Sequence, residues 1–160
     1  MPANRPSDPA PASGSFSRAL LVAVMVTVLY GAILLAFDGF VSLLADRDVI
    51  QEQDAGPLVG PIMAVVALAI VFVSVLGGLR PTSARPAIPV ARAVVTALLV
   101  YLLGPFAGAI VYVAGQEQLL TGVLFLARYL GSPFVIASAV LALLPVLLLP
   151  LIAIGRSRAR

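Results

Sequence analysis

The side chains that most often do chemistry in proteins are nearly absent from this chain of 160 residues, which contains no cysteine, histidine or tryptophan. Without cysteine it has no thiolate nucleophile, disulfide or iron–sulfur cluster. Without histidine it lacks the side chain that titrates nearest neutral pH and the usual ligand of haem, copper and zinc. We therefore predict no cofactor and no metal centre, and we expect that the protein is not an enzyme.

Carboxylates gather in one short segment, where Asp46, Asp48, Glu52 and Asp54 fall within nine residues. Carboxylate oxygens in such a segment could hold a divalent cation. The spacing matches no calcium-binding loop, however, and the central glycine of an EF-hand is missing. A solvated acidic loop is the better interpretation, and no catalytic pair can be assembled from it.

Asp38 and Arg128 could form an ion pair, because both lie near the predicted outer boundary of the membrane on different segments. If the first apolar segment packs against the last, partial desolvation would make a charge-assisted hydrogen bond between them favourable. The alternative is that each side chain reaches the water of the lipid headgroups alone.

One motif could position another helix. Gly104 and Gly108 are four residues apart, with Pro105 between them. Glycines at this spacing share one helix face and let a second backbone approach closely. Pro105 cannot donate a hydrogen bond to the carbonyl of Tyr101, so a kink is expected there. The motif predicts a helix-docking face, which could serve packing within the fold, docking of a partner or a moving hinge.

The elements that carry these residues must be embedded in lipid. Hydrophobic residues make up 61% of the chain and charged residues 11%, whereas soluble domains carry roughly a quarter charged residues. A chain this apolar could not cover its own surface with polar groups. All ten basic residues are arginine, which is typical of the coding bias of a high-GC bacterium.

Four apolar segments are long enough to cross a bilayer, since twenty helical residues extend about 30 Å, the thickness of the hydrocarbon core. The predicted spans are residues 18–37, 58–79, 90–114 and 133–154. Residues 1–17 are rich in proline and small polar residues, which predicts a disordered tail. Residues 156–160 form a short basic tail.

The last apolar stretch, residues 119–154, is 36 residues long and exceeds what one upright helix needs. Gly131-Ser132-Pro133 interrupts it with a serine N-cap followed by proline at the first helical position. We therefore predict a separate short helix at about 116–130, lying at the outer interface before the fourth span. The alternative is one strongly tilted span that begins near Leu119 and kinks at Pro133.

The distribution of arginine predicts the orientation, because arginine-rich short loops stay in the cytoplasm. Both termini and the second loop are arginine-rich and are therefore predicted to be cytoplasmic, in the plasma membrane of a bacterium. This topology explains the basic charge without nucleic acid as a partner. The arginines that could contact anionic lipid at this surface are Arg80, Arg85, Arg92, Arg156, Arg158 and Arg160.

The predicted fold is an all-α integral membrane protein, a four-helix bundle made of two hairpins. No charged residue lies near the middle of a predicted span, so a proton relay is not expected. By elimination, the expected function is that of a non-catalytic accessory subunit or assembly factor of a larger bacterial membrane complex. The alternative is a small oligomeric transporter or channel for a neutral or apolar solute. The expected partners are the lipid bilayer and either another membrane protein or further copies of the chain.

Overall fold

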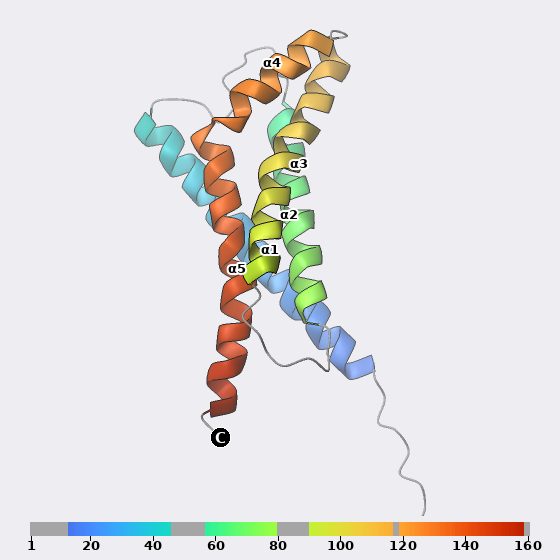
Figure 1. Cartoon of the computed structure of the whole chain (residues 1–160), viewed down its shortest axis with the longest axis vertical. Coiled ribbons are helices and arrows are strands. Elements are labelled where there is room, and N and C mark those ends of the chain that lie inside the picture. Colours follow the sequence, from blue (N-terminus) through green and yellow to red (C-terminus); the bar gives the residue numbers. More distant parts are fainter. Residues whose placement is uncertain (1–12, 46–56, 80–89, 117–118, 159–160) are drawn as a thin grey trace, which may run out of the picture.

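The computed structural model describes residues 13–45, 57–79, 90–116 and 119–158, and these residues form five α-helices with no strand among them (Figure 1). The helices are α1 (Ser13–Ala45), α2 (Val59–Gly78), α3 (Val90–Gln116), α4 (Leu119–Leu130) and α5 (Pro133–Arg158). The all-α fold predicted from the sequence is confirmed.

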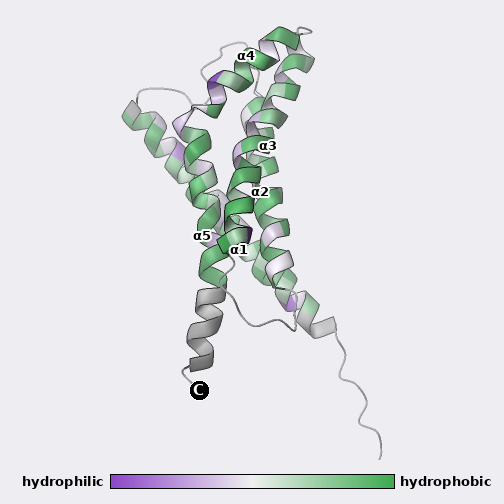
Figure 2. Ribbon diagram, viewed as in Figure 1, coloured by the Kyte–Doolittle hydropathy of each residue, from purple (hydrophilic) through white to green (hydrophobic). Residues whose placement is uncertain are grey.

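The helices are long and apolar enough for a membrane protein with about four spans. Three segments could each cross a bilayer, namely Phe16–Leu44, Val59–Gly78 and Val90–Gly115. Helices α4 and α5, bent by 60° at the break between them, are apolar enough together to count as a fourth. Hydrophobic residues predominate along the described helices (Figure 2). Many of the large ones are exposed, and Leu43, for example, is 80% exposed. Lipid is the solvent that suits such a surface.

Helix α3 is the central element, since it packs against α2, α4 and α5. Helix α1 packs against α2 and α5 only, and among the described residues it does not contact α3. It crosses the other helices at a slant, so that both of its ends diverge from them (Figure 1). The first residues of α1 and α3 and the last residues of α2 and α5 lie at the same end of the molecule (Figure 1). We call this the arginine end, after Arg18 and Arg92, and the opposite end the far end.

Helix α1 is longer than the predicted span 18–37 in both directions. Its 33 residues extend about 50 Å. Residues 13–17, predicted to be disordered, are helical. At the other end the helix continues through Asp38, because the residues that follow are mostly apolar and helix-compatible. The rest of the N-terminal tail lies outside the described residues, and so do Asp46, Asp48, Glu52 and Asp54 of the acidic loop.

The predicted break between the last two helices is confirmed at Gly131-Ser132. The backbone N–H of Ser132 donates to the carbonyl of Tyr129 (2.9 Å), and the Ser132 carbonyl accepts from the N–H of Ile136 (3.1 Å). From α3, the Tyr101 hydroxyl donates to the carbonyl of Leu130 (2.7 Å), which satisfies one of the free carbonyls at the end of α4. With 26 residues, α5 extends about 39 Å and can cross a bilayer without α4.

Two clusters of buried side chains hold the helices together. The aliphatic core joins α1, α2, α3 and α5 in the half of the molecule nearer the arginine end. The aromatic core joins α2, α3, α4 and α5 at the far end. The aliphatic core consists of Ala23, Tyr30, Leu34, Ala67, Val71, Val75, Ala93, Val100, Ala142 and Val146. The aromatic core consists of Val59, Ala109, Phe125, Tyr129 and Val135, with Tyr101 and Tyr112 packed against it.

Candidate functional site

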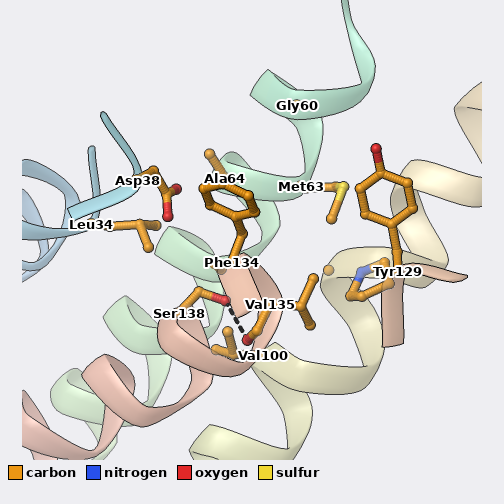
Figure 3. Close-up of a pocket in the computed structure, with 13 residues that line it drawn as sticks. Leu34, Asp38, Gly60, Met63, Ala64, Val100, Tyr129, Phe134, Val135 and Ser138 are labelled. Carbon is orange, nitrogen blue, oxygen red and sulfur yellow. Dashed lines mark hydrogen bonds between the residues drawn. The ribbon is translucent and has the colours of Figure 1, made fainter. Parts of the chain in front are cut away.

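A partly open cavity of about 70 Å³ lies between the two cores, and all five helices contribute to its wall (Figure 3). Its wall is mostly apolar, with Leu34 on α1, Met63 on α2 and Phe134 on α5. The polar side chains that reach it include Asp38 and Ser138. A cavity of this size has room for water.

Helix geometry brings Asp38 to this cavity. Tyr30, Leu34 and Asp38 are spaced four residues apart, so they lie on one face of α1. Tyr30 and Leu34 are 3% and 4% exposed, which shows that this face is turned inward. The Oδ1 atom of Asp38 is buried and has no hydrogen-bond partner within the described parts of the chain. A buried polar atom without a partner is costly, so this atom is the most unusual group in the wall.

The neighbouring hydroxyl groups do not supply the missing hydrogen bond. The Ser138 hydroxyl donates to the carbonyl of Val135 (2.8 Å). The Tyr30 hydroxyl donates to the carbonyl of Ser138 (3.0 Å) and ties α1 to α5. Each hydroxyl has a single proton, so neither can also donate to Asp38. The group that would complete the Oδ1 of Asp38 is therefore a hydrogen-bond donor.

This position of Asp38 corrects the predicted end of the first span at residue 37. Asp38 belongs to α1 and to the apolar segment Phe16–Leu44 rather than to a loop. The sequence contained a usable signal, because Phe40, Leu43 and Leu44 continue the apolar character after Asp38. The predicted span, residues 18–37, stopped before the charged residue Asp38, whereas α1 continues to Ala45.

The predicted docking face at Gly104, Pro105 and Gly108 lies inside the fold. A Cβ atom on Gly108 would come within 2.8 Å of the Met63 Sδ and 3.4 Å of the Phe125 Cε1. Gly108 therefore gives α2 and α4 close access to α3. Pro105 is fully buried, and Gly104 lines the cavity, where an added Cβ atom would meet nothing within 4 Å. All three residues are buried within the described fold, and of the two glycines Gly108 is the one packed against other helices.

The ion pair between Asp38 and Arg128 stays a prediction. Arg128 is exposed in the last turn of α4, where a positive charge interacts favourably with the helix dipole. The buried Oδ1 of Asp38 shows no hydrogen bond to it. Asp38 and Arg128 therefore lie toward the same end of the molecule, but no hydrogen bond links the Asp38 Oδ1 to Arg128.

Of the predicted lipid-facing arginines, Arg92 is described, and it is exposed near the start of α3. Arg156 and Arg158 lie in the last turns of α5, where the side chains are outside the described set. Arg80, Arg85 and Arg160 also lie outside the described residues. Contact of these arginines with lipid remains a prediction.

No arrangement for acid–base or metal chemistry surrounds the cavity in the part of the chain that the structure describes. There, Asp38 is the sole carboxylate side chain, and no group of three potential metal-ligating residues is found. The remaining polar atoms are hydroxyl groups and backbone carbonyls. What the arrangement can do is bind a donor group.

Comparison with known proteins gives a family but no function. A family model described as "Family of unknown function (DUF6121)" matches residues 14–160. No curated protein and no solved structure matches the chain.

Proposed function

We propose a function for this chain, which belongs to the family of unknown function (DUF6121). It is a non-catalytic subunit or assembly factor of a larger membrane complex. The observation that carries the proposal is the buried Oδ1 of Asp38, which lacks a hydrogen-bond partner within the described residues. A carboxylate left in this state is stabilised when another molecule supplies a donor. A partner helix meets this requirement when its donor side chain enters the partly open cavity, and α1 has to shift for that donor to reach the buried Oδ1.

Helix α1 is the surface that best suits such a partner. In an apolar stretch of 18 residues, 17% of the residues of α1 are buried, compared with 22% in α2 and 33% in α3. Its contacts with α2 and α5 use one narrow stripe that includes Ala23, Tyr30 and Leu34. Beyond this stripe, Phe40, Leu43 and Leu44 are 59–80% exposed. An apolar helix that diverges from its neighbours can pack against a partner while Asp38 accepts a hydrogen bond.

The aliphatic core argues against transport through a single chain. Val71, Val100 and Ala142, from three different helices, are at most 1% exposed between the cavity and the arginine end. Packing this tight excludes water. A solute that entered the cavity would meet this packed core on its way to the arginine end.

The test is recovery of the partner with the full-length chain from its own membranes in mild detergent. The wild type should bring down one foreign membrane protein in stoichiometric amount. Asp38→Ala should reduce that recovery about ten-fold or more, because a hydrogen bond to a charged group contributes about 1.5–3 kcal/mol. The matched control is Leu98→Ala on α3, where Leu98 is 53% exposed, and it should leave recovery unchanged. Equal recovery with Asp38→Ala would refute the proposed role of the cavity.

The second candidate is a small oligomeric transporter or channel for a neutral or apolar solute. The cavity is the observation in its favour, because copies arranged around it could extend the space across the membrane. This candidate predicts that the purified protein is a homo-oligomer without a foreign partner. Flux of a small neutral solute into vesicles that contain only this protein would favour it over the subunit.

The proposed membrane is the plasma membrane of a bacterium, with both termini in the cytoplasm. Helix α1 begins and α5 ends at the same end of the molecule (Figure 1), which supports placing both termini on one side. The arginine bias of the sequence supports the cytoplasmic side. Reporter fusions after residues 85 and 160 should report the cytoplasm, and fusions after residues 50 and 117 the outside. A cytoplasmic signal at residue 50 would reverse the orientation.

A further inference from the structure

A second open space, of about 460 Å³, lies between α2 and α3 near the arginine end. Its walls are aliphatic, with Ile70 and Val73 on α2 and Val95 and Leu99 on α3. Val73 is 66% exposed and Val95 54% exposed, so the groove opens on the outward face of the protein. In a bilayer this face meets lipid, and the groove would be filled by hydrocarbon rather than by water.

The floor of the groove has no free hydrogen-bond donor. The Thr96 hydroxyl donates to the carbonyl of Arg92 (2.8 Å). Its oxygen lies 2.5 Å from the Ser74 hydroxyl, and because Thr96 has already used its proton, Ser74 is the donor in this contact. Both protons are used within the protein. The inner part of the groove therefore suits an apolar group such as an acyl chain.

The mouth of the groove carries a positive charge. Arg92 lines the groove, and its Nη1 atom lies 2.6 Å from where a Cβ atom on Gly78 would stand. The guanidinium group therefore lies over the last turn of α2, where the helix dipole attracts a cation. The sole carboxylate side chain in the described part of the chain is Asp38, which lines the cavity between the two cores. A guanidinium group binds phosphate with two parallel hydrogen bonds.

We propose that this groove binds an anionic phospholipid of the leaflet at the arginine end. Arg92 holds the phosphate, and one acyl chain lies between α2 and α3 over the Ser74–Thr96 pair. The positive charge at the mouth of the groove matches the phosphate of such a lipid, and the hydrocarbon walls below the mouth match its acyl chain. In a bilayer the phosphate lies at the surface and the acyl chain lies below it, as the groove requires. The proposal is independent of the partner proposed for the Asp38 cavity.

The experiment titrates the full-length protein in detergent with phosphatidylglycerol or phosphatidylcholine and counts bound lipids by native mass spectrometry. The wild type should retain phosphatidylglycerol more strongly than phosphatidylcholine. Arg92→Gln should weaken phosphatidylglycerol binding about five-fold, the contribution of one basic residue at a membrane surface. The matched control is Arg18→Gln, an exposed arginine at the same end on α1 that does not line the groove, and it should weaken binding less than Arg92→Gln does.

A second variant tests the groove without changing the charge. Gly77 lines the groove, and a Cβ atom there would meet nothing within 4 Å. Gly77→Phe should therefore fill the groove without disturbing the helices, and binding of phosphatidylglycerol should fall. Equal wild-type affinity for the two lipids, an Arg18→Gln effect as large as that of Arg92→Gln, or unchanged binding with Gly77→Phe would each overturn the proposal.

Discussion

The aliphatic core near the arginine end is built mainly from alanine and valine side chains of four helices, whereas the aromatic core at the far end contains a stack of rings. Phe125 stacks on Tyr112, with ring centroids 5.1 Å apart, and on Tyr129, with centroids 4.2 Å apart. The aliphatic core has many small contacts of similar kind. The aromatic core has a few large contacts, and both ring stacks depend on the single residue Phe125.

This difference explains where the cavity lies. Small side chains let the helices of the aliphatic core approach closely, although α2 and α3 leave the outward-facing groove between them open. Large rings hold α4 against α3, but the space where α1, α2 and α5 meet this group is filled incompletely. We expect the aliphatic core to tolerate changes that conserve volume, and the far end to depend on individual residues. The variants below test this expectation, from the largest effect to the smallest.

Gly108→Leu should have the largest effect, because its side chain would displace both Met63 and Phe125. Overpacking of a tight helix contact costs about 3 kcal/mol. The expected result is a clear fall in the melting temperature of the purified protein in detergent, measured by intrinsic tyrosine fluorescence or circular dichroism. Recovery of a partner should not fall beyond the loss caused by unfolding, since Gly108 is buried within the chain.

Gly104→Ala is the matched control, one helical turn away on the same helix. Its added methyl group would project into the cavity, where nothing lies within 4 Å. Alanine also favours a helix over glycine by up to about 1 kcal/mol, so stability should stay the same or rise. A loss as large as that of Gly108→Leu would mean that the cavity is filled in solution.

Phe125→Ala should remove both ring stacks and loosen α4 from α3. We expect a loss of about 2 kcal/mol, since aromatic truncation in a core costs several kcal/mol in water and part of that loss is absent in lipid. Hydrogen exchange should increase in α4, while α2 between Ala67 and Val75 keeps its protection. Faster exchange in both helices would show that the two cores unfold as one unit and would remove the distinction between them.

Hydropathy and turn chemistry were enough to predict the parts of the fold that depend on local properties. The apolar segments predict α2 and α3 to within a few residues, because loops rich in proline, glycine and charge bound them. The break before α5 follows from Ser132-Pro133, whose backbone preferences are local. The composition of a segment sufficed for each of these predictions.

The features that depend on contacts between helices could not be predicted in the same way. Whether Gly108 meets a helix of its own chain or of a partner is decided by how α4 folds back onto α3. The inward position of Asp38 depends on which face of α1 meets α2 and α5. The cavity arises where five helices meet, and no segment by itself contains a sign of it.

Tyr101→Phe should cost about 1 kcal/mol, the usual contribution of one hydrogen bond, because it leaves the Leu130 carbonyl without a donor. Tyr30→Phe is the matched change in the aliphatic core, since it removes the hydrogen bond to the Ser138 carbonyl. Both should lower the melting temperature similarly. Only Tyr101→Phe should speed hydrogen exchange at the Ser132 amide. The same effect from Tyr30→Phe would show that the hydrogen bond of Tyr30 to α5 also stabilises the break between α4 and α5.

Asp38→Asn should have the smallest effect, and its sign is the informative result. Replacement of the carboxylate by an amide removes a charge whose Oδ1 is buried without a hydrogen-bond partner in the described chain, so the isolated protein should gain stability. The gain should be about 0.5 kcal/mol, because the side chain is only half-buried and keeps part of its hydration. A loss of stability would instead mean that the carboxylate has a partner in solution.

A double-mutant cycle of Asp38→Asn with Arg128→Gln tests whether Arg128 is that partner. A coupling free energy above about 0.5 kcal/mol would show that Asp38 and Arg128 interact. Coupling near zero, together with the expected gain, would leave the carboxylate available to a donor from outside the chain, as the proposed subunit requires.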